Sequence, residues 1–239
     1  MIRSILVLAA LLAFVDAMMV PISNECGPEL KCPSGYKLFK RKSGGWCIKF
    51  FLGNMTWWEA ERECRCTTNG AHLSGIESLE EKRWVEEVAQ EAQDAAKINN
   101  GAVWIGAYRR KDCPSGQEST WSKNELCSDE KLFQFTDHHT CGTTIFQSWS
   151  DGQPTNAVGD DCAVILSSID ASGASSEASG KTANKNCLSV NGTVSILNSI
   201  AYICGVPPVQ SGGYGGGNPY GGDEIIVVGA GKPQKKKNN

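Results

Sequence analysis

The chain has 239 residues, of which 41% are hydrophobic and 21% are charged. This length suits one good-sized domain or at most two small ones, and the apolar fraction is ordinary for a globular protein. The formal charge is -3, from 23 Lys and Arg against 26 Asp and Glu, which is opposite to the balance of a basic nucleic-acid binder. Eleven cysteines are hard to reconcile with a reducing cytosol. The composition therefore argues against full-length disorder and against a nucleic-acid partner.

Residues 1–17 are typical of a secretory signal. Arg3 supplies a positive charge, the run from Ile5 to Val15 is apolar, and a cleavage site is expected after Ala17. The run is too short to cross about 30 Å of hydrocarbon, and no later stretch is long and apolar enough. We therefore expect a secreted, extracellular protein with no membrane span. Its cysteines should form disulfides there, and because their number is odd, one thiol is free, capped or intermolecular.

Composition divides the remaining chain into three segments. Residues 18–31 form a short leader that contains Cys26, and residues 32–206 hold every other cysteine and all seven tryptophans. After Pro207-Pro208 the chain becomes rich in glycine and then in lysine, with Lys235-Lys236-Lys237 near its end. Such a segment cannot bury enough apolar surface to offset its chain entropy. Residues 207–239 are therefore expected to form a disordered tail.

A hairpin and two helices are predicted first. Residues 36–39 and 46–51 flank the turn sequence from Lys42 to Gly45, a hairpin pattern. The run from Thr56 to Glu59 is a capping box, which predicts a helix start. Three residues then share one helix face: Trp57, Ala60 and Cys64.

A second helix is predicted from Ser78, where Glu81 completes another capping box. Its expected apolar stripe consists of Trp84, Val88 and Ala92, and it should end before Asn99-Asn100-Gly101. Compact apolar runs at 103–108, 163–166 and 201–203 predict strands, and Asn191-Gly192 marks a tight turn that needs positive φ. The stretch from about 109 to 162 is loop-rich. The pattern indicates an α+β domain with weak regular structure, which would need covalent staples.

Six short segments, in order, carry a resemblance to a known family. They are Cys32-Pro33 to Trp46-Cys47, Trp57 to Cys64, Gly70-Ala71-His72-Leu73, Trp104-Ile105-Gly106-Ala107-Tyr108, Trp149 through Gln153-Pro154-Thr155-Asn156 to Asp160-Asp161-Cys162, and Tyr202-Ile203-Cys204. Together they resemble a C-type lectin-like domain over residues 32–206, closest to the long-form, secreted invertebrate members. The resemblance implies an α+β fold with two helices, two small antiparallel sheets and a long loop region.

The resemblance also implies cysteine pairings. These are Cys32 with Cys47, Cys64 with Cys204, and Cys162 with Cys187. Among the remaining cysteines, Cys113 is expected to pair with Cys127 inside the loop region, and a pair between Cys66 and Cys141 is a further hypothesis. Cys26 is then the odd thiol, which would link two chains in a dimer.

In sugar-binding members of this family, the long loop and a later strand hold a calcium ion that sugar hydroxyls coordinate. Here Gln153-Pro154-Thr155 stands where the family has Glu-Pro-Asn or Gln-Pro-Asp, and Thr182-Ala183-Asn184 stands for Trp-Asn-Asp. Asp160 is then the only clearly retained carboxylate. If the alignment with the Trp-Asn-Asp motif were shifted by one residue, Lys185 would stand at the Asp position. Because Ca²⁺ needs six to eight oxygens with several carboxylates, we expect a degenerate calcium site and no cofactor, with weak calcium binding left open.

Ligand recognition is expected instead through hydrogen bonds and stacking. The candidate ligand-binding residues are Trp121, Trp149, Gln153, Thr155, Asn156, Asp160 and Asn184. Four other tryptophans follow core patterns and are expected to be buried: Trp57, Trp58, Trp84 and Trp104.

The remaining motifs give weaker evidence about function. Asp137-His138-His139 with Cys141 offers metal-ligand types, but adjacent histidines point apart on a strand, so a polar loop without metal is expected. His72 is expected to pack or hydrogen-bond under the first helix. No orienting group or G-x-S-x-G motif supports catalysis, so no enzyme is expected. Asn54 and Asn191 begin N-glycosylation sequons.

These inferences predict a secreted, disulfide-stapled binding module that recognises an extracellular glycan or protein ligand. The alternative is a structural or matrix protein that is cross-linked through Cys26 and the Gly/Tyr-rich tail. The resemblance makes a role in innate immunity conceivable, and no residue tests it.

Overall fold

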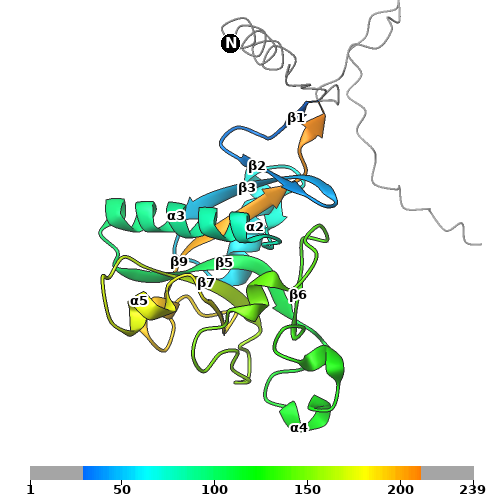
Figure 1. Ribbon diagram of the computed structural model, residues 1–239, viewed down its shortest axis with the longest axis vertical. Coiled ribbons are helices and arrows are strands. Elements are labelled where there is room, and N and C mark those ends of the chain that lie inside the picture. Colours follow the sequence, from blue (N-terminus) through cyan, green and yellow to red (C-terminus); the bar gives the residue numbers. More distant parts are fainter. Residues whose placement is uncertain (1–28, 211–239) are drawn as a thin grey trace, which may run out of the picture. The chain divides into compact units, whose positions relative to one another are not determined.

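The computed structural model describes residues 29–210 (Figure 1). The expected signal, the leader thiol Cys26 and the Gly-rich and Lys-rich tail lie outside the described residues, apart from the first few positions assigned to the tail. Within the described part, no helix combines the length and the apolar character needed to cross a membrane.

The described part of the chain forms ten strands, four α-helices and three short 3-10 helices. The strands are β1 (Leu30–Lys31), β2 (Lys37–Arg41), β3 (Gly44–Leu52), β4 (His72–Leu73), β5 (Asn100–Arg109), β6 (Phe133–Phe135), β7 (Cys162–Ser168), β8 (Thr182–Lys185), β9 (Ser199–Val206) and β10 (Val209–Gln210). The helices are α2 (Trp57–Thr67), α3 (Leu79–Ala96), α4 (Glu118–Trp121), α5 (Ala174–Ala178), η1 (Glu125–Cys127), η2 (Thr144–Gln147) and η3 (Ser195–Leu197). The α+β class is confirmed, with two long helices as expected and two short ones in addition.

The strands form one main sheet and one small one. The main sheet has eight strands in the order β2-β3-β9-β5-β7-β8, with β4 paired to β9 and β6 paired to β5. Its pairs are antiparallel except β5 and β9, which run parallel in the middle of the sheet. The small sheet pairs β1 with β10, so ordered pairing begins at Leu30 and reaches Gln210, slightly beyond the expected 32–206 on both sides. The predicted hairpin is present as β2 and β3.

Helix α2 begins as its sequence predicts. The Thr56 side chain accepts a hydrogen bond from the backbone N–H of Glu59, and the Glu59 carboxylate accepts one from the backbone N–H of Thr56. These bonds also lower the pKa of the Glu59 carboxyl. Trp57, Ala60 and Cys64 are all buried, as their spacing predicts.

Helix α3 differs from its prediction in the face that it buries. Ser78 caps the helix by accepting from the backbone N–H of Glu81, but the Glu81 carboxylate is turned toward Arg41 instead of closing a second box. The buried stripe is Glu81, Val85, Ala89 and Gln93, one position away from the expected Trp84, Val88 and Ala92. Distant partners make the polar ends of this stripe stable when buried: Arg41 pairs with Glu81, and Gln93 exchanges hydrogen bonds with Ser167.

The core lies on both faces of the main sheet. Because successive side chains of a strand point to opposite faces, Val103 and Ile105 pack in one cluster with α3, while Trp104 packs in the other with α2. Figure 1 shows both helices beside strands β3, β9 and β5. Gly106 has to be glycine, because a Cβ there would lie 2.0 Å from the Leu73 carbonyl oxygen.

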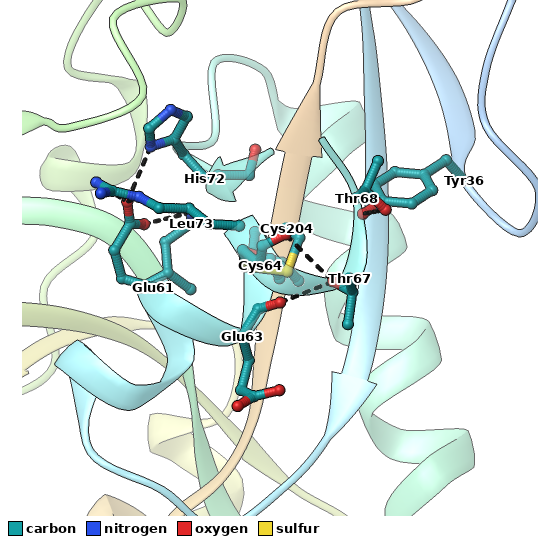
Figure 2. The surroundings of a disulfide bond; sticks show 12 residues. Tyr36, Glu61, Glu63, Cys64, Thr67, Thr68, His72, Leu73 and Cys204 are labelled. Carbon is teal, nitrogen blue, oxygen red and sulfur yellow. Dashed lines mark hydrogen bonds and ion pairs between the residues drawn. A yellow bond between two sulfur atoms is a disulfide. The ribbon is translucent and has the colours of Figure 1, made fainter. Parts of the chain in front are cut away.

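Four disulfides fasten these elements. Cys32–Cys47, Cys64–Cys204 and Cys162–Cys187 are the pairs that the resemblance implied, and Cys113–Cys127 lies within the loop region as expected. Figure 2 shows Cys64 of α2 joined to Cys204 of β9, with a sequence separation of 140. The same view shows the predicted hydrogen bond under the helix, where His72 Nδ1 lies 2.8 Å from Glu61 Oε1.

Two local predictions are wrong. Cys66 and Cys141 do not pair with each other, and both are free and exposed. The Asn191-Gly192 segment is not a turn with positive φ, since neither residue is among the described positive-φ positions. Gly192 instead permits a close approach, because a Cβ there would lie 2.1 Å from that of Leu197.

Candidate ligand-binding site in the long loop

Five of the predicted ligand-binding residues come together where the long loop, residues 110–161, meets strand β8. Gln153, Thr155, Asn156 and Asp160 belong to the loop, and Asn184 belongs to β8. The peptide bond between Gln153 and Pro154 is cis. The structure thus places together the polar residues that the resemblance selected.

Asn184 holds the loop through its backbone and its side-chain amide. Its Oδ1 accepts from the backbone N–H of Thr155 at 2.7 Å, and its Nδ2 donates to the carbonyl oxygens of Thr155 and Asp160 at 2.9 and 2.6 Å. Its backbone N–H donates to Gln153 Oε1 at 3.0 Å. The Thr155 hydroxyl donates to Asp160 Oδ2 at 2.6 Å. Because the amide is buried and all of these groups bond to one another, the loop is fixed against the sheet by protein contacts alone.

Arg109, at the end of β5, is a cation that the sequence analysis missed. Its guanidinium donates to Asn156 Oδ1 at 2.9 Å and to the carbonyl oxygen of Thr155 at 2.5 Å, and its Nε lies 3.1 Å from Asp161 Oδ1. Burial lowers the pKa of Arg109, and Asp161 and Asp160 partly oppose that shift. Arg109 is therefore a fixed positive charge beneath the loop. A signal was present in the sequence: the period-2 alternation of β5 places Arg109 on the same face as the buried Ala107.

Lys185 is a second buried cation at the site, and the sequence analysis named it only as the occupant of a calcium-ligand position in a shifted alignment. Its Nζ donates to the carbonyl oxygens of Val190 and Leu197 and to Ser199 Oγ, at 2.8, 2.6 and 3.0 Å. The ammonium also lies 4.9 Å from the centre of the Trp104 ring. Burial lowers the pKa of Lys185 to about 8, and the charge of Asp160 acts in the opposite direction.

The residues present do not fit a calcium ion. The amide oxygens of Gln153 and Asn184 already accept backbone hydrogen bonds, and the buried Ala183 has no side-chain oxygen to offer. Asp160 lies close enough to Lys185 and Arg109 for its charge to act on both. Because Ca²⁺ is held by six to eight oxygens that include several carboxylates, two protein cations beside a single retained carboxylate oppose its binding.

A hollow of about 420 Å³ opens beside these residues. Most of the residues that line it are of polar type, and they come from the loop, from β8 and from the segment that follows β8: Gln153, Thr155, Ala157, Asp160, Asn184, Lys185, Asn186, Ser189, Asn191, Gly192, Thr193 and Leu197. Asn191, the first residue of one sequon, is exposed at this hollow, and Asn54 of the other sequon is exposed before α2. The arrangement can present amide, hydroxyl and carboxylate groups to a polar ligand.

The two predicted tryptophans are not part of this site. Trp121 is only 7% exposed, and its ring nitrogen donates to the carbonyl oxygen of Pro114, so it belongs to the core beneath the long loop. Trp149 is half-buried and stacks on Phe146 with ring centres 5.6 Å apart. The burial of Trp121 contradicts its expected ligand contact, whereas a ligand contact by the half-buried Trp149 stays a prediction.

The prediction for Trp58 was wrong in the opposite direction. It was expected in the core, yet 50% of its surface is exposed. Trp57 and Trp104 are buried as predicted, and Trp84 is partly buried against the core. Position 58 follows Trp57 by one residue, so a helix that buries Trp57 turns Trp58 toward solvent.

The histidine-rich segment is tied to the fold by its carboxylate. Asp137 accepts hydrogen bonds from the backbone N–H groups of Gly75, His139 and Thr140 and from the Thr140 hydroxyl. His139 stacks on Trp46 with ring centres 4.6 Å apart. Within residues 29–210, no group of three or more His, Cys, Asp and Glu side chains is arranged to hold a metal.

The sequence matches the family described as C-type lectin domain-containing protein 141/158 over residues 38–207. The chain belongs to the C-type lectin domain family. C-type lectin domain-containing protein 158 of Caenorhabditis elegans is 26% identical over 153 residues, which are 61% of this chain and 70% of that protein. One chain of the snaclec coagulation factor IX/factor X-binding protein of Gloydius halys is 31% identical over 139 residues, 55% of this chain and 84% of its own. Among solved structures, the C-type lectin CEL-I from Cucumaria echinata has a TM-score of 0.46 and 20% identity, covering 75% of this chain and 99% of its own.

Proposed function

We propose that this C-type lectin domain protein is a secreted, non-enzymatic binding protein that recognises an extracellular glycan or protein through the long-loop hollow without calcium. The observation that carries the proposal is the pair of fixed cations, Arg109 and Lys185, beside a loop whose amide oxygens are already hydrogen-bonded. A loop held in this way keeps its shape without an ion. Its hollow then offers hydrogen-bonding groups directly to a ligand.

Both ligand classes fit this proposal. A glycan would use the amide and hydroxyl groups around Gln153 and Asp160. A protein ligand is supported by the Gloydius halys relative, which is named for its binding to coagulation factors. An N-glycan on Asn191 would stand at the hollow and would narrow access to it.

Calorimetric titration with calcium tests whether the protein binds the ion. No heat of binding is expected at micromolar calcium, and micromolar affinity would contradict the proposal. A glycan array with and without chelator then tests the ligand class. Binding that survives the chelator supports calcium-independent sugar recognition, whereas the loss of all signals with chelator contradicts it.

A matched pair of variants tests the place of binding. Gln153→Ala removes an amide that lines the hollow, whereas Gln147→Ala removes an exposed amide at the end of η2. Ligand affinity should fall in the first variant and remain unchanged in the second. Equal affinities in both would place the ligand elsewhere.

A disulfide-linked dimer is a further proposal. Cys66 and Cys141 are exposed and unpaired in the described structure, and Cys26 lies outside it. Non-reducing electrophoresis of the Cys→Ser variants at these three positions would identify the linking thiol. A monomer in every lane of the unsubstituted chain would contradict the dimer.

A further inference from the structure

An exposed tryptophan, Trp58, lies outside the long-loop hollow, at the first turn of α2. Trp58 packs edge-on against the buried Trp57, with ring centres 4.8 Å apart, and lies 6.0 Å from the Tyr108 ring. The Trp57 ring is itself anchored by its Nε1, which donates to the carbonyl oxygen of Ile105 at 2.9 Å. Trp58 is therefore held in a defined orientation while half of its surface faces solvent. A fixed, exposed indole offers a flat apolar surface at little entropic cost.

A second hollow, of about 230 Å³, borders the same Tyr108. It is lined by Tyr108, Arg109, Arg110, Lys111, Pro114, Ser115 and Asp161. Arg109 and Asp161 form an ion pair and offset each other. Arg110 and Lys111 then leave this hollow with a positive charge, although the whole chain is negative.

These two cations differ in how they are placed. Arg110 is anchored, because its Nε donates to the carbonyl oxygen of Lys131 at 2.6 Å and its Nη1 donates to Gln134 Oε1 at 3.3 Å. Its Nη2 has no partner among residues 29–210. Lys111 is exposed and makes no hydrogen bond or ion pair with any described residue. An anchored guanidinium beside a mobile ammonium is suited to an anionic group such as a sulfate or a carboxylate.

We propose that the surface formed by Trp58, Tyr108, Arg110 and Lys111 binds an anionic sugar. The apolar face of a sugar ring stacks on Trp58, and its sulfate or carboxylate pairs with Arg110 and Lys111. Tyr108, whose ring lies 6.0 Å from the indole and which lines the second hollow, connects the two contacts. This surface is separate from the long-loop hollow, so it takes a charged ligand whether or not the proposed long-loop binding is correct.

Direct binding of defined oligosaccharides to the full, disulfide-bonded chain tests this inference. The probes are a sulfated chondroitin oligosaccharide, an unsulfated hyaluronan oligosaccharide of equal length and a neutral chitin oligosaccharide, each measured by calorimetry at physiological ionic strength. Binding of either charged probe and weaker binding of the neutral one support the proposal. Because both charged probes carry carboxylates, stronger binding of the sulfated one identifies the sulfate, and equal binding identifies the carboxylate. Failure of both charged probes to bind overturns it.

Two variants separate the stacking contact from the charge contact. Trp58→Ala should weaken binding of the charged probe about tenfold or more, and Trp58→Tyr should restore part of it. The double variant Arg110→Ala, Lys111→Ala should weaken binding about tenfold and flatten its dependence on salt. Leu79→Ala and Lys123→Ala, two exposed positions elsewhere, are the matched controls and should leave binding unchanged.

Three further results would overturn the proposal, and one control keeps it distinct from the long-loop site. Unchanged affinity in Trp58→Ala, unchanged affinity in the double variant, or equal binding of a single-stranded oligonucleotide of the same charge would each contradict an anionic-sugar surface. Gln153→Ala should leave binding of the charged probe unchanged. If Gln153→Ala alone weakened binding of the charged probe, the anionic sugar would bind in the long-loop hollow instead.

Discussion

The molecule buries an arginine at each of two places, and the two sites behave differently. Arg41 forms a two-bond ion pair with Glu81, at 2.7 and 2.8 Å, and its remaining donors bond to Thr140 and to the carbonyl oxygen of Gly75. Both charged side chains of that pair are 1% exposed. Arg109 instead divides its donors among several loop groups, and its contact with Asp161 is an ion pair without a hydrogen bond at Nε.

The difference separates a structural region from a recognition region. The Arg41 pair joins β2 to α3, two regular elements, and it leaves no charge in excess. Arg109 and Lys185 instead hold irregular chain, the long loop and the segment 186–199, by donating to its carbonyl oxygens, and the Asp161 side chain beside Arg109 is 22% exposed. Buried charges of the first kind fix a fold, whereas those of the second kind shape a surface that a ligand can read.

Removing disulfides should show the largest contrast between the two regions. Cys64→Ser with Cys204→Ser opens a crosslink with a separation of 140, whereas Cys113→Ser with Cys127→Ser opens one with a separation of 14. In the chain-entropy description the first costs about 5 kcal/mol and the second about 3 kcal/mol of the unfolding free energy. Denaturant titration of both double variants measures these values. Equal losses would indicate that loop closure does not govern stability here.

Truncating each buried arginine is the next test of the comparison. Arg41→Ala leaves the Glu81 carboxylate buried without its partner, which should cost about 3–5 kcal/mol of unfolding free energy. Arg109→Ala leaves Asp161, whose side chain is 22% exposed, so a loss of about 1–3 kcal/mol is expected. Urea unfolding measures both.

The two arginine variants should rank in the opposite order when ligand affinity is measured instead of stability. Arg109→Ala should weaken ligand binding in the long-loop hollow, whereas Arg41→Ala should leave it unchanged at temperatures where the variant remains folded. A larger loss of affinity in Arg41→Ala would contradict the division into structural and recognition regions.

Alkaline pH should affect the Lys185 region specifically. The pKa of Lys185 is about 8 in the folded chain against 10.5 for an ordinary lysine, so between these values the unfolded chain binds the extra proton. Stability contributed by Lys185 therefore rises with pH in that window, by at most about 1.4 kcal/mol per pH unit. Urea unfolding of the parent chain and of Lys185→Met, both with Cys26, Cys66 and Cys141 replaced by Ser to prevent thiol exchange, measures this. Parallel pH profiles would contradict it.

The helix cap of α2 should give the smallest effect. Thr56→Ala removes the hydroxyl that accepts from the backbone N–H of Glu59, which should cost about 1 kcal/mol of unfolding free energy. Thr56→Ser keeps both the cap and the sequon at Asn54 and serves as the control. Thermal unfolding of protein made without glycosylation isolates the cap. An unchanged melting temperature in Thr56→Ala would indicate that the box adds nothing.

Local signals predicted the fold better than the site. The α2 cap and the β2–β3 hairpin depend on neighbours a few residues apart, and both were correct. The buried stripe of α3 was displaced by one position because Glu81 and Gln93 are polar, and only their distant partners, Arg41 and Ser167, make their burial favourable. Apolar periodicity cannot detect such pairs.

The candidate site was predicted in its polar residues and in Asp160, but not in its buried cations. The resemblance selected the five residues from Gln153 to Asn184, which do lie together. Arg109 and Lys185 were missed because a cation in a strand is ordinarily solvent-exposed, and its burial depends on the loops that fold over it. Trp58 and Trp121 exchanged their expected roles for different reasons. The helix that buries Trp57 turns Trp58 toward solvent, whereas Trp121 is buried by the packing of the long loop, which no local pattern reveals.

The pairing of β1 with β10 has a consequence for protein engineering. Leu30 and Gln210 are register partners, so the chain enters and leaves the folded unit at neighbouring points. A short linker between these points would permit circular permutation, and the whole unit could be inserted into a surface turn of an unrelated host protein without stretching either strand.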